Sequence, residues 1–581
     1  AGGARVSTLI VRRQGQSWPG DASDAEALLA CLYRARGARW PDEGRYPLSG
    51  LLPPTSMLGL GEAAALLCDA LEAGRSILVV GDFDVDGATS TVLALEALRA
   101  MGHSRVDFLV PNRFEYGYGL SPEIVAEAGA RGAELIITVD NGISSIDGVA
   151  AANAAGIDVL VTDHHLPGDQ LPAAAAIVNP NQSGCGFPSK ALAGVGVIFY
   201  VMTALRSALR TRGWFERRGL AEPNMASLLD LVALGTVADV VPLDYNNRIF
   251  VHQGLQRIRS GRSRPGLCAL LKVADRRVGD AVASDLGFAV GPRLNAAGRL
   301  DDMTHGILCL LAKTPAEADW LAQELDGLNR ERREIEQGMQ QEAIAVVERL
   351  DLSGRALPVG LCLYEPGWHQ GVVGILAARI RERYHRPVIA FADAGAGLIK
   401  GSARSIPGLH IRDALDAVAA RHPGLLHKFG GHAMAAGMEL GRADFERFAA
   451  AFDAVVAAQL ADTQLRGEVL SDGALAPRQL GLELAQRLRE GGPWGQHFPE
   501  PVFDGEFALL EQRLVGGKHL KLKLAPAVDP QQTLDAIWFN IDPALWPRPD
   551  VSRAQVAYRL DVNEFRGFIN LQLMVEQINP L

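Results

Sequence analysis

Asp163, His164 and His165 are three adjacent side chains that can do chemistry, and they directly follow the apolar run 158–162. Two imidazoles beside a carboxylate can ligate a metal ion or transfer a proton. The same group could instead be a hydrogen-bonded turn. It becomes informative because polar, mostly acidic side chains follow three apolar runs upstream in the same way.

Asp82, Asp84 and Asp86 follow the first of these runs, 76–80. An EF-hand loop would need a Glu about six residues after its Gly and a helix on each side, whereas here a predicted buried strand comes first. A plain acidic turn is the other alternative. Because three crowded carboxylates repel one another unless a cation neutralises them, the pattern favours a metal site. Oxygen ligands with one or two imidazoles suit Mn²⁺ or Mg²⁺ better than a structural zinc.

Asp140 and Asp239 each end another apolar stretch, so both are candidate metal ligands. Either could instead cap the N-terminus of a helix, a position that Asp favours, and the two roles are compatible. Asp163 could ligate a metal directly or could orient His164 or His165 through a hydrogen bond. The sequence leaves both roles of Asp163 open.

The elements that must hold these side chains alternate between strand and helix. Strands are predicted at 76–80, 106–110, 135–139 and 158–162, with helices at 88–101, 121–131 and 143–155. This alternation predicts right-handed βαβ units and a parallel sheet, in which ligands bind at the carboxyl ends of the strands. The side chains expected at that edge are Asp82, Asp84, Asp86, Arg113, Asp140, Asp163, His164 and His165.

Later segments add groups that could bind an anion. Arg404, with Ser402, and Arg299, with Arg293 and Asn295 nearby, occur in segments whose glycines predict loops. Such segments favour phosphate binding by guanidinium and backbone amide groups, although an Arg is more often an ordinary surface charge.

Three further basic groups occur near the C-terminus, in the alternating stretch 516–524. His519, Lys521 and Lys523 would share one face of a strand there. That face could contact nucleic acid, or it could be a solvated edge strand protected by Lys.

The composition is that of an ordinary globular chain. With 581 residues, 48% hydrophobic and 21% charged, three or four domains are expected. The six cysteines form no CxxC pair, so neither a disulfide framework nor a zinc knuckle is indicated. No apolar run reaches the roughly 20 residues of a membrane span and no signal-peptide pattern is present, so a cytoplasmic location is expected. The net charge of −10 decides nothing about nucleic acid, because a nuclease needs only a local basic track.

Together these residues resemble the DHH phosphoesterase superfamily, and within it the bacterial exonucleases that act on single-stranded DNA. The segments similar to its four metal motifs are 81–87, 138–142, 163–165 and 235–239. Those similar to its DHH-associated domain are 367–369, 401–404 and 430–432. The resemblance covers the chain from about residue 50 onward, and only 493–498 departs from the expected pattern of a loop in the last domain.

The resemblance implies an α/β fold with several domains. These are an N-terminal segment (1–55), a parallel-sheet DHH catalytic domain (56–312), a long connecting helix (313–352), a second α/β, DHH-associated substrate-binding domain (353–460) and a C-terminal β-barrel of the oligonucleotide-binding (OB) type (465–581). The capping signal at Thr314 and Pro315 independently predicts the start of that long helix.

The resemblance also implies an activity: a two-metal hydrolase, using Mn²⁺ or Mg²⁺, that removes nucleotides from single-stranded DNA in the 5′-to-3′ direction during DNA repair and recombination. The implied metal ligands are Asp82, Asp84, Asp86, Asp140, His164 and Asp239. The implied catalytic groups are Asp163, His165, Arg299, His369 and His432. The implied substrate-binding groups are Arg113, Asn295, Ser402, Arg404, Lys521 and Lys523, with Arg113, Ser402 and Arg404 holding the 5′ phosphate.

The implied partners are a DNA 5′ end, a single-strand-binding protein and a helicase, with a monomeric chain and no membrane. Two alternatives remain at this point. One is a small-molecule or oligonucleotide phosphoesterase of the same superfamily, against which the residues beyond 465 count. The other is a non-catalytic replication scaffold, against which the retained Asp and His residues count.

Overall fold

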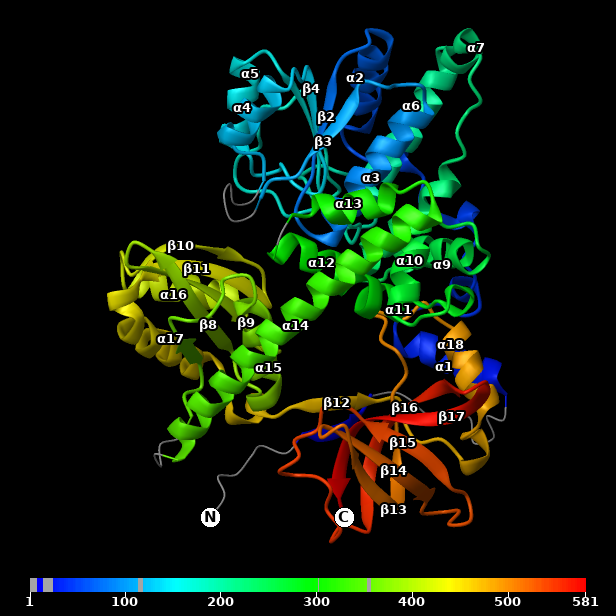
Figure 1. Ribbon diagram of the computed structural model, residues 1–581, viewed down its shortest axis with the longest axis vertical. Helices are drawn as coiled ribbons and strands as arrows, with labels where there is room; N and C mark the ends of the chain where they lie inside the picture. Colours follow the sequence, from blue (N-terminus) through cyan, green and yellow to red (C-terminus); the bar gives the residue numbers. More distant parts are fainter. Residues whose placement is uncertain (1–7, 14–23, 113–118, 301, 353–356) are drawn as a thin grey trace. The chain divides into compact units, whose positions relative to one another are not determined.

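The computed structural model divides into two compact units (Figure 1). It describes residues 8–13, 24–112, 119–300, 302–352 and 357–581. The first unit comprises Ala1–Gln16, Arg330–Leu482 and Val502–Leu581, and the second comprises Ser17–Asn329 and Glu483–Pro501. The long helix α14 (Pro315–Leu352) begins in the second unit and ends in the first, as the capping signal at its start predicts.

The second unit contains the predicted parallel sheet. Its strand order is β3-β2-β4-β5-β6 and every neighbouring pair is parallel. The strands are β2 (Ile77–Val80), β3 (Val106–Leu109), β4 (Leu135–Thr138), β5 (Asp158–Thr162) and β6 (Ala176–Val178). The first four were predicted from their apolar runs. The fifth, β6, was missed, because three residues are too short to show a pattern.

Helices cover both faces of this sheet. The core on one face includes α4 (Pro122–Ala130) and α5 (Ile146–Ala154), and that on the other includes α2 (Leu60–Glu72), α3 (Val85–Ala100) and α6 (Gly194–Thr211). Figure 1 shows α4 and α5 together on one side of β2–β4. A sheet buried on both faces explains why its strands are continuous apolar runs without alternation.

A buried ion network joins three helices of this unit. Arg264, which precedes α10 (Pro265–Val273), binds both oxygens of Asp230 on α8 (Leu229–Ala238) at 3.0 Å. It also donates to Glu96 of α3 at 2.8 Å. Asp230 is 1% exposed, so its charge is compensated almost entirely by protein groups, and the burial penalty on Arg264 is offset in the same way.

The segment Glu483–Pro501 belongs to the second unit although the chain before and after it belongs to the first. Trp494 and Phe498 contact the ring of Tyr33 on α1 (Ala25–Ala35). The Tyr33 hydroxyl donates to the carbonyl of Gly491 at 2.7 Å. The predicted last domain (465–581) is therefore interleaved with the second unit at this segment.

The first unit contains a mixed five-stranded sheet of order β10-β11-β9-β8-β7. Its strands are β7 (Leu361–Tyr364), β8 (Val388–Gly395), β9 (Leu398–Arg404), β10 (Leu426–Gly431) and β11 (Ala435–Gly441). Helix α15 (Val373–Tyr384) packs on β7 and β8, whereas α16 (Ile411–Arg421) and α17 (Phe445–Gln459) form a separate core with the other face.

The same unit contains a closed five-stranded barrel of order β13-β14-β15-β17-β16. Its strands are β13 (Phe503–Val515), β14 (His519–Pro526), β15 (Leu534–Trp538), β16 (Arg553–Phe565) and β17 (Phe568–Pro580). Leu520, Leu522 and Leu524 point into the core and Lys521 and Lys523 point outward, which confirms the alternation predicted for this strand. The predicted α/β fold with a terminal β-barrel is thus confirmed.

The N-terminal strand β1 (Leu9–Arg12) pairs in parallel with β12 (Glu468–Ser471), next to the barrel. Arg12 donates two hydrogen bonds to Asp504 of β13, at 3.0 and 3.1 Å. Asp504 also accepts from Gln555 of β16 at 3.2 Å. This described part of the N-terminal segment is therefore tied to the barrel and not to the parallel sheet that follows it in sequence.

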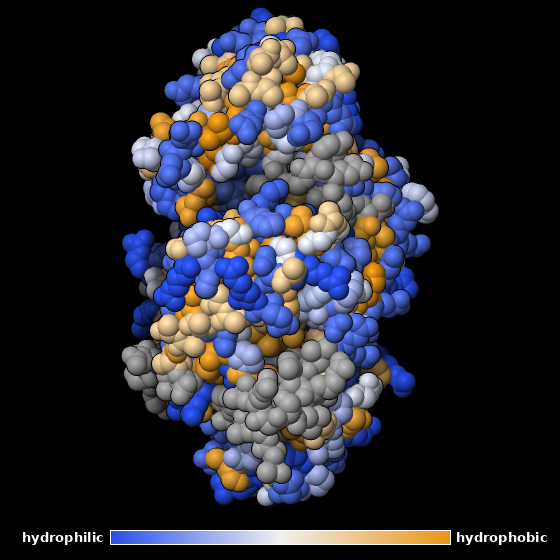
Figure 2. Space-filling view, turned by 90° about the vertical axis from the view of Figure 1, so that its left-hand side faces the viewer, coloured by the Kyte–Doolittle hydropathy of each residue, from blue (hydrophilic) through white to orange (hydrophobic). Residues whose placement is uncertain are grey.

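No single helix among the described residues is long and apolar enough to cross a membrane, although one bent pair, Leu48–Ser56 with Leu60–Glu72, passes that test by length and composition. On the face drawn in Figure 2, hydrophilic and hydrophobic residues are interspersed. Scattered exposed apolar side chains of this kind are normal and need no special explanation.

Candidate metal centre and substrate surfaces

The acidic loop that follows β2 carries three of the predicted ligands. Asp84 caps the N-terminus of α3, where it accepts from the Gly87 N–H at 2.7 Å. Asp86 lies in the first turn of α3, and its two oxygens accept from the first amides of α6, Gly194 and Val195, each at 2.8 Å. The Asp86 carboxylate is therefore held from behind by a helix N-terminus, which favours its charged form.

Asp140, directly after β4, has a left-handed backbone with φ +58°. Such a conformation is uncommon for a residue other than Gly, and Asp and Asn tolerate it best. A Cβ built on Gly194 would lie 2.8 Å from the Cβ of Asp140 and 2.9 Å from its Oδ1. Gly194 is thus needed for close approach, and it lets α6 pack directly against this carboxylate.

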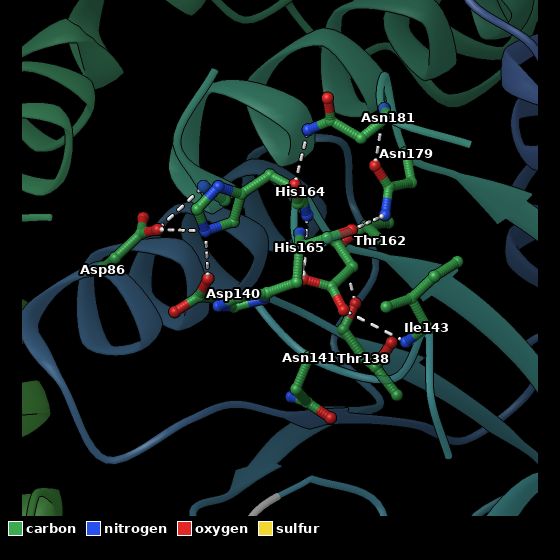
Figure 3. Close-up of polar contacts among 12 residues, drawn as sticks. Asp86, Thr138, Asp140, Asn141, Ile143, Thr162, His164, His165, Asn179 and Asn181 are labelled. Carbon is green, nitrogen blue, oxygen red and sulfur yellow. Dashed lines mark hydrogen bonds and ion pairs between the residues drawn. The ribbon is translucent and has the colours of Figure 1, made fainter. Parts of the chain in front are cut away.

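His164 lies at the centre of the acidic group. Its Nε2 is 2.9 Å from Asp140 Oδ1, 3.4 Å from Asp239 Oδ2 and 3.5 Å from Asp86 Oδ2. Figure 3 shows its ring directed between Asp86 and Asp140. Asp239 is the C-terminal cap of α8. The alternative that Asp140 or Asp239 caps a helix N-terminus is wrong, because the next helix after each has another N-cap: Ser145 for α5 and Asp244 for α9 (Tyr245–Arg259).

His165 forms a separate pair with Asp163. Its Nδ1 is 2.6 Å from Asp163 Oδ1, and the other oxygen, Oδ2, accepts from the Ile143 N–H at 3.0 Å. Burial by itself would lower the pKa of His165, but the hydrogen bond and charge of Asp163 outweigh it and raise the pKa to about 9. For Asp163, burial opposes ionisation, and the bond to His165 overcomes it and lowers the pKa.

Among the residues that the structure describes, three groups of side chains place ligand atoms within 4.8 Å of one another: Asp82, Asp84 and Asp140; Asp86, His164 and Asp239; and Asp140, His164 and His165. Asp140 belongs to two of them. Burial raises the pKa of Asp86 to about 7, and repulsion from Asp84 adds to the shift. Burial and neighbouring carboxylates also raise the pKa values of Asp82, Asp140 and Asp239 well above the ordinary range. Carboxylates that repel one another in this way are stabilised by a bound cation, and carboxylate and imidazole ligands together suit divalent metal ions.

We expect the metal-free protein to lose stability as the pH rises from about 4 to about 7. The pKa of Asp86 rises from 3.8 in its ordinary state to about 7 in the fold, so over this range the folded protein holds a proton that the unfolded chain has released. Thermal unfolding from pH 5 to 8 in EDTA should show this fall, and Mn²⁺ should reverse it most strongly at high pH. A melting temperature in EDTA that rises with pH would contradict the inference that burial and mutual repulsion raise the pKa values of these carboxyl groups.

Helix α12 (Gly291–Leu300) carries Asn295 and Arg299, both partly buried. The prediction that they lie in a Gly-rich loop is wrong. A Cβ on Gly298 would lie 2.1 Å from the Phe83 carbonyl oxygen, so this Gly instead allows the helix to pack against the acidic loop. Arg293 pairs with Asp326 at 3.0 Å. Arg113 lies outside the described residues.

In the first unit, Ser402 and Arg404 both lie on β9, not in the predicted loop. The Arg404 Nη1 donates to Ser402 Oγ at 3.1 Å and to the Ala403 carbonyl at 2.8 Å. A Cβ on Gly374, at the start of α15, would lie 2.6 Å from Arg404 Nη2 and 2.9 Å from Ser402 Oγ. Burial, and then the charge of Arg381, lower the pKa of Arg404. A partly buried guanidinium and a hydroxyl at the start of a helix form a setting that suits a phosphate.

His369 and His432 belong to the same unit and are both exposed. His369 precedes α15, and its Nδ1 accepts from the Gly371 N–H at 2.9 Å. His432 follows β10, and its backbone N–H donates to the Ala435 carbonyl at 2.9 Å.

Three family models match the chain: the DHH family N-terminal domain over residues 76–236, the DHHA1 domain over 357–458 and the RecJ OB domain over 471–577. The single-stranded-DNA-specific exonuclease RecJ of Escherichia coli is 58% identical over 554 residues, which cover 95% of this chain and 96% of that protein. The chain belongs to the RecJ family. The exonuclease RecJ of Bacillus subtilis is 35% identical and is covered over 67% of its length.

A solved RecJ structure has the same fold. The crystal structure of RecJ in complex with Mn²⁺ from Thermus thermophilus superposes with a TM-score of 0.78 at 31% identity, covering 99% of this chain and 80% of that one. A second structure of that RecJ is a complex with Mg²⁺ and superposes with a TM-score of 0.72 at 29% identity.

The barrel matched by the RecJ OB model presents Lys521 and Lys523 on β14 with different neighbours. Lys523 lies between Glu511 of β13 and Asp535 of β15. Lys521 lies between Arg513 and Ile537 in the same register. Of these two lysines, Lys521 is therefore the one that has no acidic residue directly opposite it on either neighbouring strand.

Sequence reasoning missed several groups that hold the RecJ-type centre. The amides of Gly194 and Val195 begin a helix more than a hundred residues from Asp86, and no local pattern connects them. Asn179 and Asn181, which bind the backbone of the His pair, flank Pro180 directly after β6. The Asn-Pro sequence indicates a turn but not what the turn contacts.

Proposed function

We propose that this chain is a metal-dependent exonuclease that removes nucleotides from single-stranded DNA, beginning at the 5′ end. One observation carries the proposal: two groups of ligand atoms adjoin each other at the carboxyl edge of the parallel sheet, and Asp140 is close to both. Membership of the RecJ family supports the substrate. The RecJ OB match counts against the small-molecule phosphoesterase, and the complete ligand set counts against a scaffold.

In this proposal Asp82, Asp84 and Asp140 would hold one Mn²⁺ or Mg²⁺ ion, and Asp86, His164 and Asp239 the other, with Asp140 shared. Two such ions, when bound, activate a water and stabilise the leaving oxygen of an in-line displacement. The chain's own contribution is to fix these side chains before substrate arrives. The α6 amides hold Asp86, and the close approach of Gly194 fixes Asp140.

His165 and Asp163 would form the acid of the site. Burial lowers the pKa of His165, but the hydrogen bond and charge of Asp163 outweigh it and raise that pKa, which favours an imidazolium that can donate a hydrogen bond to a phosphate oxygen. Asp163 would orient that ring and would not itself ligate metal, since it belongs to none of the three ligand groups found among the described residues. Arg299, Asn295, His369 and His432 are proposed to bind near the scissile phosphate.

Ser402 and Arg404 are proposed to hold the terminal 5′ phosphate, together with Arg113. We expect Arg404→Ala to cost about 1.5–3 kcal/mol in kcat/KM, the range for a hydrogen bond to a charged group. The loss should be larger on a 5′-phosphorylated than on a 5′-hydroxyl strand, because the terminal phosphate carries the extra charge. Arg412→Ala, which removes an Arg lying over the Phe429 ring in the same domain, is the control. An equal loss on the two substrates would assign end recognition elsewhere.

The barrel is proposed to bind the single strand along the Lys521 side of its outer face. Because Lys521 lacks acidic neighbours in the sheet, Lys521→Gln should weaken binding and reduce the slope of log K against log salt by about 0.7 for a single strand. Lys523→Gln should change both much less, since Glu511 and Asp535 flank that charge on the two neighbouring strands. Titration of labelled oligonucleotide at several salt concentrations measures this. Equal slopes for the two variants would contradict the proposed side.

The test of the function is digestion of single-stranded and duplex DNA labelled at either end, with Mn²⁺, with Mg²⁺ and with EDTA. We expect mononucleotides from the 5′ end of single strands only, and none in EDTA. Release from the 3′ end, or equal digestion of duplex, would overturn the proposal. A cytoplasmic role in repair and recombination, as a monomer working with a helicase and a single-strand-binding protein, would follow from this activity.

A further inference from the structure

The backbone of His164 and His165 lies just beyond the parallel sheet and has lost its strand partners. Strand β5 ends at Thr162, and the last ladder bond on this side is from the Asp163 N–H to the Val178 carbonyl at 3.1 Å. The next residues carry the two imidazoles. Because buried peptide groups need partners, something other than the sheet must hold this dipeptide.

Side chains bind the backbone N–H groups of this dipeptide on one side and its carbonyls on the other. Asp163 Oδ1 accepts from the N–H of His164 at 2.8 Å and from that of His165 at 3.2 Å. The carbonyl of His164 accepts from Asn181 Nδ2 at 2.6 Å, and the carbonyl of His165 accepts from Asn179 Nδ2 at 2.8 Å. Figure 3 shows the two asparagines on the opposite side of the histidines from Asp86 and Asp140.

The orientation of the Asn179 side-chain amide is determined by a further bond. Asn179 Oδ1 accepts from the backbone N–H of Asn181 at 2.8 Å, so its Nδ2 must face the His165 carbonyl. The loop behind them is fixed as well, because Lys190 Nζ donates to the carbonyls of Pro180 at 2.7 Å and Cys185 at 3.0 Å. Strand β6 thus sets the register of the asparagines against β5 and the histidines.

We propose that Asn179 and Asn181 are positioning residues that fix the imidazoles of His164 and His165 through their backbone carbonyls. This inference rests on the proposed function. His164 Nε2 must meet the second ion between three carboxylates, and a tilt of its peptide would move that atom out of reach. Asn179 acts on the His165 ring, because the hydrogen bond of that ring to Asp163 depends on the geometry of the His165 peptide.

The experiment compares Asn181→Ala and Asn179→Ala with the full-length wild-type chain. Loss of a residue that orients a metal ligand typically costs about 10–100-fold in affinity or activity. We expect Asn181→Ala to weaken one of two Mn²⁺ sites by this factor, measured by calorimetry and by electron paramagnetic resonance, and to leave the other unchanged. The kcat should fall by a similar factor at moderate Mn²⁺, recover at high Mn²⁺, and leave KM for DNA unchanged. Asn179→Ala should lower kcat without that recovery, because it acts on His165.

Two further variants exclude a merely structural effect. Asn153→Ala removes an amide that donates to the Ala173 carbonyl at 3.0 Å, in the same domain but on the exposed face of α5, and should change neither Mn²⁺ binding nor kcat. Asn181→Asp keeps the shape but removes the donor, so it should behave as Asn181→Ala does. Melting in EDTA should be the same for Asn181→Ala and Asn153→Ala.

Normal Mn²⁺ affinity and kcat in both Asn181 variants would overturn the inference and leave the proposed exonuclease intact. A wild-type chain that binds no Mn²⁺ would overturn both. These two results are distinguished by the wild-type titration alone.

Discussion

Asp140→Asn should abolish hydrolysis, with a loss of at least about 10³-fold in kcat, equivalent to about 4 kcal/mol. Among the described residues, Asp140 is the one carboxylate that belongs to two of the three ligand groups, and it lies 2.9 Å from His164 of the remaining group, so its loss would affect two ions at once. Asn is chosen because it tolerates the left-handed backbone at this position and keeps the shape of the side chain. Activity on a 5′-phosphorylated single strand, with Mn²⁺ varied over a wide range, is the measurement.

Stability separates this effect from unfolding. Because Asp140 repels Asp86, Asp84 and Asp239, the Asn variant should melt no lower than wild type in EDTA at neutral pH, and it should gain less from Mn²⁺. Asp147→Asn changes an exposed carboxylate a few residues further along the chain and should leave activity unaltered. Near-normal turnover by Asp140→Asn in Mn²⁺ would refute the shared-ligand arrangement.

Arg264→Met should lower the free energy of unfolding of the catalytic unit by about 3–5 kcal/mol, the cost of leaving a buried charge unpaired. Asp230 would lose a bidentate partner while remaining 1% exposed, and Glu96 would lose its bond at 2.8 Å. The network links α8, which ends at Asp239, to α3, which carries Asp86. Metal affinity should therefore decline along with stability.

Urea unfolding in EDTA measures this loss. Arg210→Met, which removes an exposed Arg paired with Glu222, is the matched control and should leave the unfolding midpoint in place. Combining Arg264→Met with Asp230→Leu should recover part of the stability, since replacing both partners by apolar groups removes the unpaired charge at Asp230. If Arg264→Met alone unfolded at the wild-type urea concentration, the pair would contribute nothing to this fold.

The metal centre illustrates how local and long-range information divide in this chain. Four apolar runs predict four strands, and the residue after each run lies at the carboxyl edge of the sheet. Local chemistry therefore identified the acidic loop, Asp140 and the His pair as neighbours. It did not give the division into ligand groups, because that depends on which carboxylate oxygens face His164.

The anion-binding residues divide in the same way. The glycines around Arg299 and Arg404 predicted loops, but Arg299 lies on helix α12 and Arg404 lies on strand β9. The glycines there serve close packing instead: Gly298 against the Phe83 carbonyl, and Gly374 against Arg404. A sequence does not distinguish a glycine that is required for close packing from a glycine that is required for a turn.

The sequence by itself determined the α/β class, the order of the elements and the residue types at the site, because strand and helix periodicity and turn chemistry act over a few residues. Tertiary structure alone decided that the α6 amides hold Asp86, that Asn179 and Asn181 hold the His peptides, and that β1 and the segment Glu483–Pro501 pack with parts of the chain distant in sequence. These contacts join residues that are far apart along the chain. They form because buried charges and peptide groups need partners in the packed fold. No pattern over a few residues predicts which residues those partners are.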